Sequence, residues 1–113
     1  MNITFEWDAA KASINKNKHG VSFEEAKTVF YDENAVVIAD PEHSDDEERF
    51  VMLGLSVVSR ILVVIHCYRE NDKVIRIISA RKATNKESMQ YRGDLWKKNM
   101  IFHKRKRIHT FGI

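Results

Sequence analysis

Cysteine is almost absent from this sequence, and its scarcity excludes one class of small protein. The 113 residues contain a single cysteine, Cys67, so no disulfide can form within the chain. Cys67 lies inside a run of strand-forming residues, where a buried structural thiol is commoner than a nucleophile. We therefore expect a protein of the reducing cytoplasm that does not depend on disulfides for its fold.

Other features of membrane, metal-binding and phosphate-binding proteins are missing too. No apolar run approaches the roughly 20 residues of a membrane helix, and the N-terminus carries no signal-peptide pattern. There is no Gly-rich phosphate loop, no Cys/His cluster and no convincing carboxylate pair, so we expect no metal, no cofactor and no metal-dependent hydrolysis. Repeats and linkers are absent. With 43% hydrophobic and 31% charged residues, the chain is expected to form one globular domain.

Charge is distributed very unevenly along the chain. The net charge is only +3, but residues 81–113 hold ten Lys or Arg and two acids, a balance of +8. Residues 32–48 hold eight acids and no Lys or Arg. A basic end of this kind indicates a polyanionic partner, nucleic acid above all. On charge alone, a solvated basic tail explains it equally well.

The clearest structural pattern is a β-hairpin over residues 60–83. Two runs rich in Val and Ile flank the polar residues 70–73, which suit a tight turn with Asn71 and Asp72 as its two central residues. The resulting register pairs Glu70 with Lys73, Cys67 with Arg76 and His66 with Ile77.

Alternation in this register assigns the polar residues of the hairpin to two faces. His66, Ser79 and Arg81 fall on one face. Arg76 falls on the other, together with Arg69. A bulge would change this assignment, because a shift of one residue moves the side chains that follow to the opposite face. Both faces are apolar in the middle, so we expect the two strands to be central in their sheet.

The remaining segments predict three more strands and three helices. Strands are expected at residues 3–7, 35–39 and 49–56, and helices at 9–18, from the capping box Ser22–Glu25 to about Asp32, and from the capping box Thr84–Glu87 to about Trp96. The core-facing positions of the second helix are Phe23, Ala26, Val29 and Phe30. The element order is then β-α-α-β-β-β-β-α. We therefore predict an α+β fold, a small antiparallel β-sheet with packed helices.

Two histidines outside the hairpin have structural explanations. His19 follows Lys18 in the last turn of the first helix, before Gly20, where cations complement the helix dipole. A role at the helix end is therefore preferred over a catalytic one. His43 lies in the acidic loop 42–48, but the spacing matches no metal-ligand pattern, so a solvated loop is preferred.

Several ordered blocks of the sequence resemble the BrnT family of type II toxins. They cover roughly residues 3–91 and comprise Phe5-Glu6-Trp7-Asp8, Lys11, Asn15, residues 18–26, Val29-Phe30, Asp40-Pro41, Glu48-Arg49, Gly54, Arg60, Val63-Val64, His66, Arg69, residues 76–81, Ala83, Glu87 and Tyr91. The resemblance implies that residues 1–91 form a single BrnT-like toxin domain. Because family members end soon after the Glu/Tyr helix, residues 92–113 are expected to be a basic C-terminal extension of that helix or a tail.

The resemblance also implies a fold, an activity and a partner. The fold would be similar to that of RelE-type ribonuclease toxins. The activity would be cleavage of RNA that inhibits translation. The partner would be a BrnA-like antitoxin, which neutralises the toxin and binds operator DNA through a ribbon-helix-helix segment. The expected assembly is a two-plus-two complex.

Cleavage of RNA without a metal makes three chemical demands. The 2′-OH must lose its proton, the developing phosphorane charge needs a cationic cradle, and the leaving 5′-oxygen needs an acid. Arg81 is the first choice for the cradle, because a guanidinium binds phosphate in two places and stays charged. His66 titrates near neutral pH and can serve as acid or base. Glu87 and Tyr91, four residues apart on the last helix, can act as base, acid or orienting partner.

Arg76 completes the catalytic candidates, although it can instead pin a helix or meet the antitoxin. The candidate contacts to the RNA backbone are Lys18, Arg49, Lys82 and Lys86. The main catalytic candidates also have structural explanations: Arg81 as an ion-pair partner of Glu87, His66 as a hydrogen-bonded sheet residue and Tyr91 as a core residue. The competing function is a non-catalytic module whose basic face binds RNA, DNA or only a partner protein.

Overall fold

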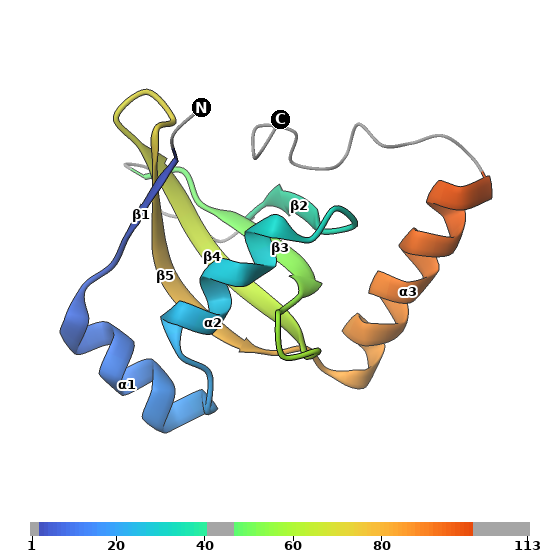
Figure 1. The fold of residues 1–113 in the computed structure, drawn as a ribbon, viewed down its shortest axis with the longest axis horizontal. Coiled ribbons are helices and arrows are strands. Elements are labelled where there is room, and N and C mark those ends of the chain that lie inside the picture. The colour runs from blue at the N-terminus through green and yellow to red at the C-terminus, as the bar shows by residue number, and fades with distance from the viewer. Residues whose placement is uncertain (1–2, 41–46, 101–113) are drawn as a thin grey trace.

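The fold is a five-stranded sheet with α1 and α2 packed on one of its faces. A computed structural model of the chain describes residues 3–40 and 47–100, with side chains as far as Gly93. Along the chain the elements are β1 (Thr4–Glu6), α1 (Ala9–His19), α2 (Phe23–Thr28), the 3₁₀ helix η1 (Val29–Tyr31), β2 (Val36–Ala39), β3 (Phe50–Leu55), β4 (Ile61–Arg69), β5 (Val74–Lys82) and α3 (Asn85–Met100). The strands lie in the order β1-β5-β4-β3-β2 (Figure 1).

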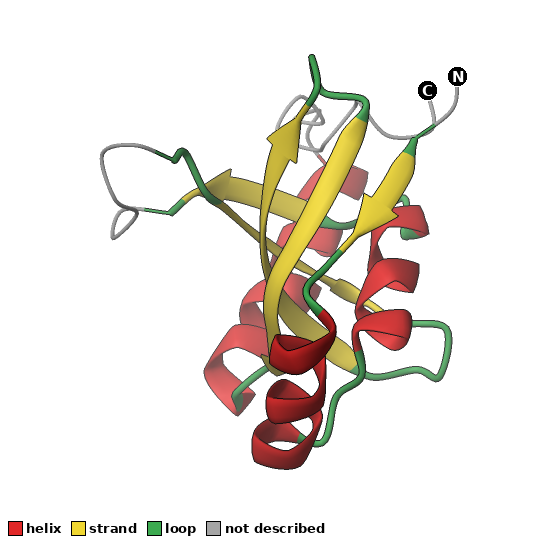
Figure 2. Cartoon of the chain, turned by 90° about the vertical axis from the view of Figure 1, so that its left-hand side faces the viewer, coloured by secondary structure: helices red, strands yellow, loops and turns green. Residues whose placement is uncertain are grey.

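The predicted element order and the α+β class are confirmed. Strands β2 to β5 pair antiparallel, as expected. β1 differs, because it joins the edge of the sheet parallel to β5, with Phe5 beside Ile75. Alternation predicted the β1 strand but not its direction, which depends on a pairing with a segment far along the chain. Figure 2 shows the strong twist of the resulting sheet.

The tight turn of the hairpin is confirmed. Asn71 and Asp72 have φ values of 59° and 68°, as a type I′ turn requires. The Lys73 N–H donates to the Glu70 carbonyl at 3.2 Å and closes the turn. The predicted pairs Cys67–Arg76 and His66–Ile77 are both present.

A β-bulge overturns the predicted register farther along the hairpin. His66 pairs with Ile77, but the preceding residue Ile65 pairs with Ser79, so Ile78 is an extra residue in β5. One extra residue turns over the rest of the strand. The prediction that His66 and Ser79 share a face is therefore wrong.

The bulge also moves Arg81 to the other side of the sheet. Arg81 lies opposite Val63, and Arg76 lies opposite Cys67. Val63 and Cys67 are four residues apart on β4, so they point to the same face. Arg81 therefore shares a face with Arg76, and the predicted face common to Arg81 and His66 is wrong.

The hydrophobic core lies between the short helices and the face of the sheet that carries His66. We call this side the helical face. The predicted stripe of Phe23, Ala26, Val29 and Phe30 is confirmed, since all four residues are buried. These residues belong to one cluster with the sheet residues Met52, Leu62, Val64, Ile75, Ile77 and Ala80.

The predicted helix starts are confirmed, but one predicted contact is replaced. Asp8 accepts the Lys11 N–H at 2.9 Å, and the Ser22 hydroxyl accepts the Glu25 N–H at 3.0 Å. The Glu25 carboxylate does not complete the capping box with Ser22. The carboxylate pairs instead with Arg60, the residue directly before β4. A guanidinium donates two charge-assisted hydrogen bonds to a carboxylate, whereas the backbone of Ser22 would donate one from a neutral N–H.

Several boundaries differ from the predicted ones. The helix expected to reach about Asp32 divides into α2 and η1, and α3 runs past Trp96 to Met100. Within the described residues, no helix combines the length and apolar character needed to span a membrane. The loop position His43 and residues 101–113 lie outside the described residues.

Candidate functional site

The strongest candidate site lies where β5 ends and α3 begins. The Arg81 guanidinium donates from Nη1 to Glu87 Oε1 at 2.8 Å and from Nη2 to Glu87 Oε2 at 2.9 Å. Its Nη1 also donates to the Lys82 carbonyl at 3.3 Å. Among the described residues, these contacts leave the Nε–H and one Nη2–H of the guanidinium without an acceptor. The Arg81 side chain is 40% exposed, so these two donors remain available to an anion.

Glu87 is held in place by the start of α3 as well as by Arg81. Its Oε1 accepts the Thr84 N–H at 2.9 Å, and its own N–H donates to Thr84 Oγ1 at 3.1 Å, which confirms the predicted capping box. The hydrogen bond from Arg81 lowers the pKa of Glu87 from 4.5 to about 2. A carboxylate with so low a pKa is a weak proton acceptor, so the position of Glu87 suits orientation of Arg81 better than proton transfer.

A second group of arginines lies on the same side of the sheet. Arg76 Nη1 donates to Glu6 Oε2 at 2.9 Å, and Arg69 Nε lies 3.5 Å from the same oxygen. We call the side that carries Arg69, Arg76 and Arg81 the arginine face. The predicted shared face of Arg69 and Arg76 is thus confirmed. Along the strand, Arg76 and Arg81 lie opposite β4 residues four positions apart, a separation of about 13 Å.

His66 lies in the core on the helical face. Its side chain is 0% exposed, and its ring centroid lies 4.8 Å from that of Phe30 and 5.3 Å from that of Tyr68. Burial lowers the pKa of His66 from 6.5 to about 4, so the ring is neutral at neutral pH. The sheet separates this ring from Arg81, and the structural explanation for His66 accounts for its position better than the catalytic one.

Tyr91 anchors α3 to the rest of the domain. Its side chain is buried, and its hydroxyl donates to Asp32 Oδ2 at 2.7 Å. The same carboxylate oxygen accepts the Leu55 N–H at 2.8 Å, so the hydroxyl ties α3 to the end of β3. Burial, reinforced by Asp32, raises the pKa of Tyr91. The structure therefore brings Arg81 and Glu87 together and leaves Tyr91 in a packing role.

Comparison with known proteins supplies the family. The family described as "Ribonuclease toxin, BrnT, of type II toxin-antitoxin system" matches residues 7–87. The chain belongs to the BrnT family. No curated protein matches it. Among solved structures, the fold is similar to the 1.1 Å crystal structure of the Brucella abortus ribonuclease toxin BrnT, with a TM-score of 0.55 and 22% identity, over 74% of this chain and 100% of that chain.

The BrnT match confirms the resemblance drawn from the sequence blocks. It places the chain among the ribonuclease toxins of type II toxin–antitoxin systems. Likeness to the Brucella structure confirms the α+β fold, whose sheet is open rather than closed into a barrel. At 22% identity this likeness concerns the fold alone, so the roles of individual residues depend on the geometry described above.

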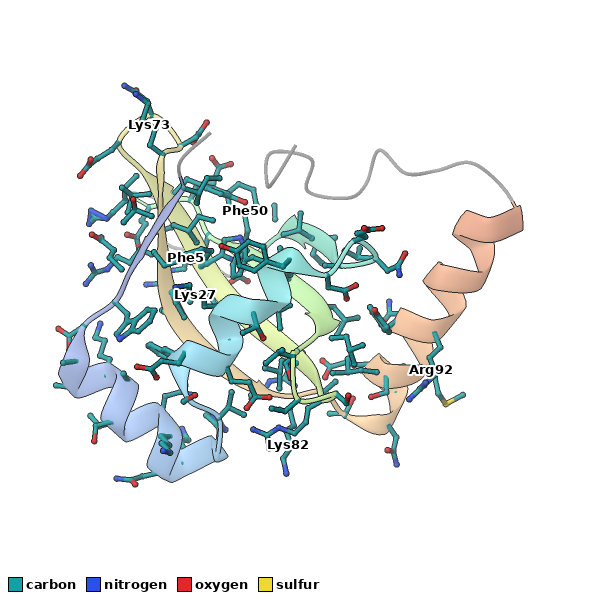
Figure 3. The ribbon with its side chains drawn as sticks, in the orientation of Figure 1. Phe5, Lys27, Phe50, Lys73, Lys82 and Arg92 are labelled. Carbon is teal, nitrogen blue, oxygen red and sulfur yellow. The ribbon has the colours of Figure 1, made fainter. Side chains whose placement is uncertain are left out.

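Two of the expected RNA contacts lie beside the Arg81 site of this BrnT chain. Lys82 directly follows Arg81, and Lys86 stands in the first turn of α3; both are exposed. Figure 3 shows Lys82 at the opposite end of β5 from Lys73, which marks the tip of the hairpin. At this junction Arg81 pairs with Glu87 on the arginine face, while Lys82, opposite Leu62, projects from the helical face of the sheet.

The other two expected RNA contacts come from other elements of the chain. Lys18 is exposed in the last turn of α1. Arg49 lies just before β3 and pairs with Glu47 at 3.3 Å. Since the next residue, Phe50, lies opposite His66, Arg49 is level with the hairpin end of the sheet and not with the Arg81 site.

Neither Cys67 nor the acidic residues within the described ranges form an alternative site. Cys67 is free and 2% exposed, as predicted, and burial raises the pKa of its thiol, which disfavours a thiolate nucleophile. In the part of the chain that the structure describes, no three His, Cys, Asp or Glu side chains gather in a way that could hold a metal ion.

Sequence reasoning missed two residues whose contacts lie beside the arginines. Glu6 holds Arg76 and Arg69, but the parallel pairing that brings it there has no local signal. Asn15 is 6% exposed and bonds to the backbone next to Arg81. A signal for Asn15 did exist, because a polar residue on the inward stripe of a helix needs a hydrogen-bond partner.

Proposed function

We propose that this BrnT-family chain is an endoribonuclease toxin that cleaves RNA without a metal and so inhibits translation in the cytoplasm. The observation that supports the proposal is the Arg81–Glu87 pair on the arginine face. Glu87 fixes the Arg81 guanidinium, and among the described residues two of its N–H donors have no acceptor. Guanidinium groups stabilise the charge that develops on a phosphorane, and this stabilisation requires no metal.

Each residue of the proposed site has a separate role. Arg81 binds the scissile phosphate, and Glu87 fixes the plane of its guanidinium without taking a proton. Arg76 is about 13 Å away along the strand, so it is assigned to another phosphate of the same RNA. Lys82 and Lys86 neutralise backbone phosphates beside the junction. His66 and Tyr91, which the sequence offered as acid or base, are assigned to the fold, so solvent water takes the proton of the 2′-OH and returns one to the leaving 5′-oxygen.

An RNA cleavage assay in EDTA tests the proposal. We expect the wild-type protein to cleave a structured RNA, and Arg81→Ala to be at least about 100-fold slower, as for removal of one charge-stabilising donor group. Lys73→Ala is the matched control, since it removes an exposed cation from the hairpin tip at the far end of β5. Its rate should stay within about threefold of wild type, because Lys73 lies outside the proposed site.

Three results would contradict parts of the proposal. RNA that stays intact at high protein concentration would reject catalysis. Cleavage that stops in EDTA and returns with Mg²⁺ would reject metal independence. An equal loss in Arg81→Ala and Lys73→Ala would show that total charge matters and that Arg81 has no special role.

We also propose a BrnA-like antitoxin as the partner, in a two-plus-two complex that binds operator DNA through the antitoxin. The antitoxin is expected to cover Arg81 with an acidic or amphipathic segment, because such a segment best occludes a cationic face. If expression arrests growth and co-expression of a BrnA-like antitoxin relieves the arrest, that result would support the toxin role. A complex in which Arg81 remains open to solvent would contradict the occlusion.

A non-catalytic binding module is the second candidate function. Two observations favour it: Glu87 neutralises Arg81, and the titratable His66 lies on the other side of the sheet. The EDTA assay separates the two functions. A binding module would retain RNA in a filter-binding or gel-shift experiment while leaving it intact.

A further inference from the structure

Asn15 on α1 makes three hydrogen bonds from a nearly buried side chain. Its Nδ2 donates to the Ala80 carbonyl at 2.8 Å and to the Val21 carbonyl at 3.0 Å. Its Oδ1 accepts the Ala80 N–H at 3.1 Å. Asn15 is 6% exposed and Ala80 is 1% exposed, so water has little access to these groups. The Asn15 carboxamide thus bonds to Ala80 as a neighbouring strand would.

This contact completes the outer edge of β5. Among residues 3–40 and 47–100, β1 pairs with β5 only over Val74–Arg76, and no described strand lies on that side of the far half of β5. Ala80 would then leave a buried N–H and a buried carbonyl without partners, which is a costly arrangement. Asn15 supplies the missing donor and the missing acceptor from a single side chain.

The same contact distinguishes between two registers of the hairpin. Because Ala80 gives both backbone groups to Asn15, its pair with Val64 on β4 is one that shares no hydrogen bonds. In a regular ladder without the bulge, Ala80 would lie opposite Val63 and its backbone groups would turn inward to β4. Asn15 can bond to Ala80 only in the bulged register.

The register decides where Arg81 emerges. In the regular ladder Arg81 would lie opposite Leu62, which is fully buried on the helical face, away from Glu87. In the bulged register it lies opposite Val63 and meets Glu87. We propose that Asn15 is a positioning residue that holds β5 in the bulged register and thereby places Arg81 against Glu87 on the arginine face. Its relevance to RNA cleavage rests on the proposed function.

The Glu87 pKa measured by carboxyl carbon NMR is the first test, because it reports the Arg81 contact without any assay of activity. Wild type should titrate near 2. In Asn15→Ala the pKa should rise by at least one unit toward 4.5 as Arg81 leaves the carboxylate. Asn17→Ala is the matched control, an exposed asparagine on the same helix, and should titrate as wild type. A folded Asn15→Ala that still titrates near 2 would overturn the proposal.

Three further measurements keep the test decisive if Asn15→Ala does not fold. Asn15→Asp retains the acceptor for the Ala80 N–H but, when ionised, loses both donors; its Glu87 pKa should lie between those of wild type and Asn15→Ala. In wild type, the Ala80 amide should exchange as slowly as that of Met52 in the central strands, and cross-strand contacts should join Val63 to Arg81. Fast exchange at Ala80, or contacts joining Leu62 to Arg81, would overturn the proposal.

Cleavage kinetics separate this inference from the proposed function. If Asn15 positions Arg81, the rate of RNA cleavage should fall at least about tenfold in the folded Asn15→Ala and stay unchanged in Asn17→Ala. A raised Glu87 pKa with unchanged cleavage would support the positioning of Arg81 and reject Arg81 as the catalytic group. An unchanged Glu87 pKa with lost cleavage would reject the positioning of Arg81 by Asn15 and would leave Arg81 as the catalytic candidate.

Discussion

Arg81 and Glu87 join the last strand to the last helix through two parallel hydrogen bonds of 2.8 and 2.9 Å. Glu87 also caps the first turn of α3 through Thr84, so one carboxylate fixes both the helix start and the guanidinium. Because a pair of this geometry favours the ionised carboxylate, the stability of the domain should depend on the ionisation of Glu87.

The first prediction concerns this pH dependence. The folded-state pKa of Glu87, about 2, lies below the ordinary value of 4.5, so its contribution to stability is complete above pH 4.5 and is lost as the pH falls toward 2. Glu87 is partly exposed, so we expect Glu87→Gln to lower the free energy of unfolding by about 1 kcal/mol at pH 7. Urea denaturation should show this difference shrinking between pH 5 and pH 2. The exposed Glu24→Gln serves as the control for removal of one surface carboxylate.

The second prediction concerns His66, a base whose charged form is disfavoured in the folded protein. Its folded-state pKa of about 4 lies below 6.5, because burial disfavours the imidazolium. The unfolded chain therefore takes up a proton first, and stability should fall by up to about 3 kcal/mol as the pH drops from 6.5 to 4. His66→Phe should lack this part of the pH dependence in denaturation experiments. It should also retain RNA cleavage at pH 7; loss of cleavage in a folded variant would return His66 to the catalytic candidates.

Tyr91 yields the third prediction. Tyr91→Phe removes the hydrogen bond to Asp32 and keeps the buried ring, so the free energy of unfolding should fall by about 1 kcal/mol. Cleavage should stay within about threefold of wild type, because the hydroxyl is committed to Asp32. A loss comparable to that of Arg81→Ala, in protein shown to be folded by circular dichroism, would contradict the packing role.

A fourth prediction concerns the clamp between α2 and the turn before β4. Arg60 donates to Glu25 from Nε at 3.0 Å and to the Gly20 carbonyl from Nη2 at 3.1 Å, while the Ser56 hydroxyl donates to Glu25 at 2.7 Å. These bonds hold the pKa of Glu25 below its ordinary value, with the hydrogen bond from Arg60 as the main cause. Arg60→Met should lower the free energy of unfolding by about 2 kcal/mol, since it leaves a largely buried carboxylate without its charge partner.

The control for Arg60→Met is a substitution of Lys73, an exposed cation for which the described residues supply no carboxylate partner. Lys73→Met at the exposed hairpin tip should change the free energy of unfolding by less than about 0.5 kcal/mol. If both substitutions have the same small effect in urea denaturation, the clamp contributes nothing beyond surface charge. A Glu25→Gln, Arg60→Met double variant should lose less than the sum of the two single variants.

Local patterns in the sequence predicted the parts of the fold that depend on neighbouring residues. The turn at Asn71 and Asp72 follows from residues that tolerate positive φ. The caps at Ser22 and Thr84 follow from side chains that reach the next helical turn. The Arg81–Glu87 pair was expected as one of two explanations, because both residues flank the junction of β5 and α3. In each case the determining contact spans only a few residues of chain.

The failures all arise from contacts between distant segments. Ile77 and Ile78 are both strand-forming apolar residues, so alternation gives no sign of which one is the extra residue of the bulge. The bulge is compatible with Asn15, on a helix 65 positions earlier in the chain. The face assigned to Arg81 was therefore wrong, and the partner of Glu25 was missed for a similar reason. In both cases the deciding contact joins side chains or backbone groups that local alternation does not relate to one another.

The bulge divides β5 into two segments, one on each side of Ile78. The registers in which the two segments pair with β4 differ by one residue. Because Ile78 is the extra residue, its deletion would join the two segments in one continuous register. Every other residue of β5 would keep its present partner on β4. The shortened hairpin would still display Arg81 on the same face as Arg76, but without the local twist of the bulge. Such a deletion separates two properties that point substitutions change together: the side from which the guanidinium emerges and the curvature of the surface that an RNA strand would follow.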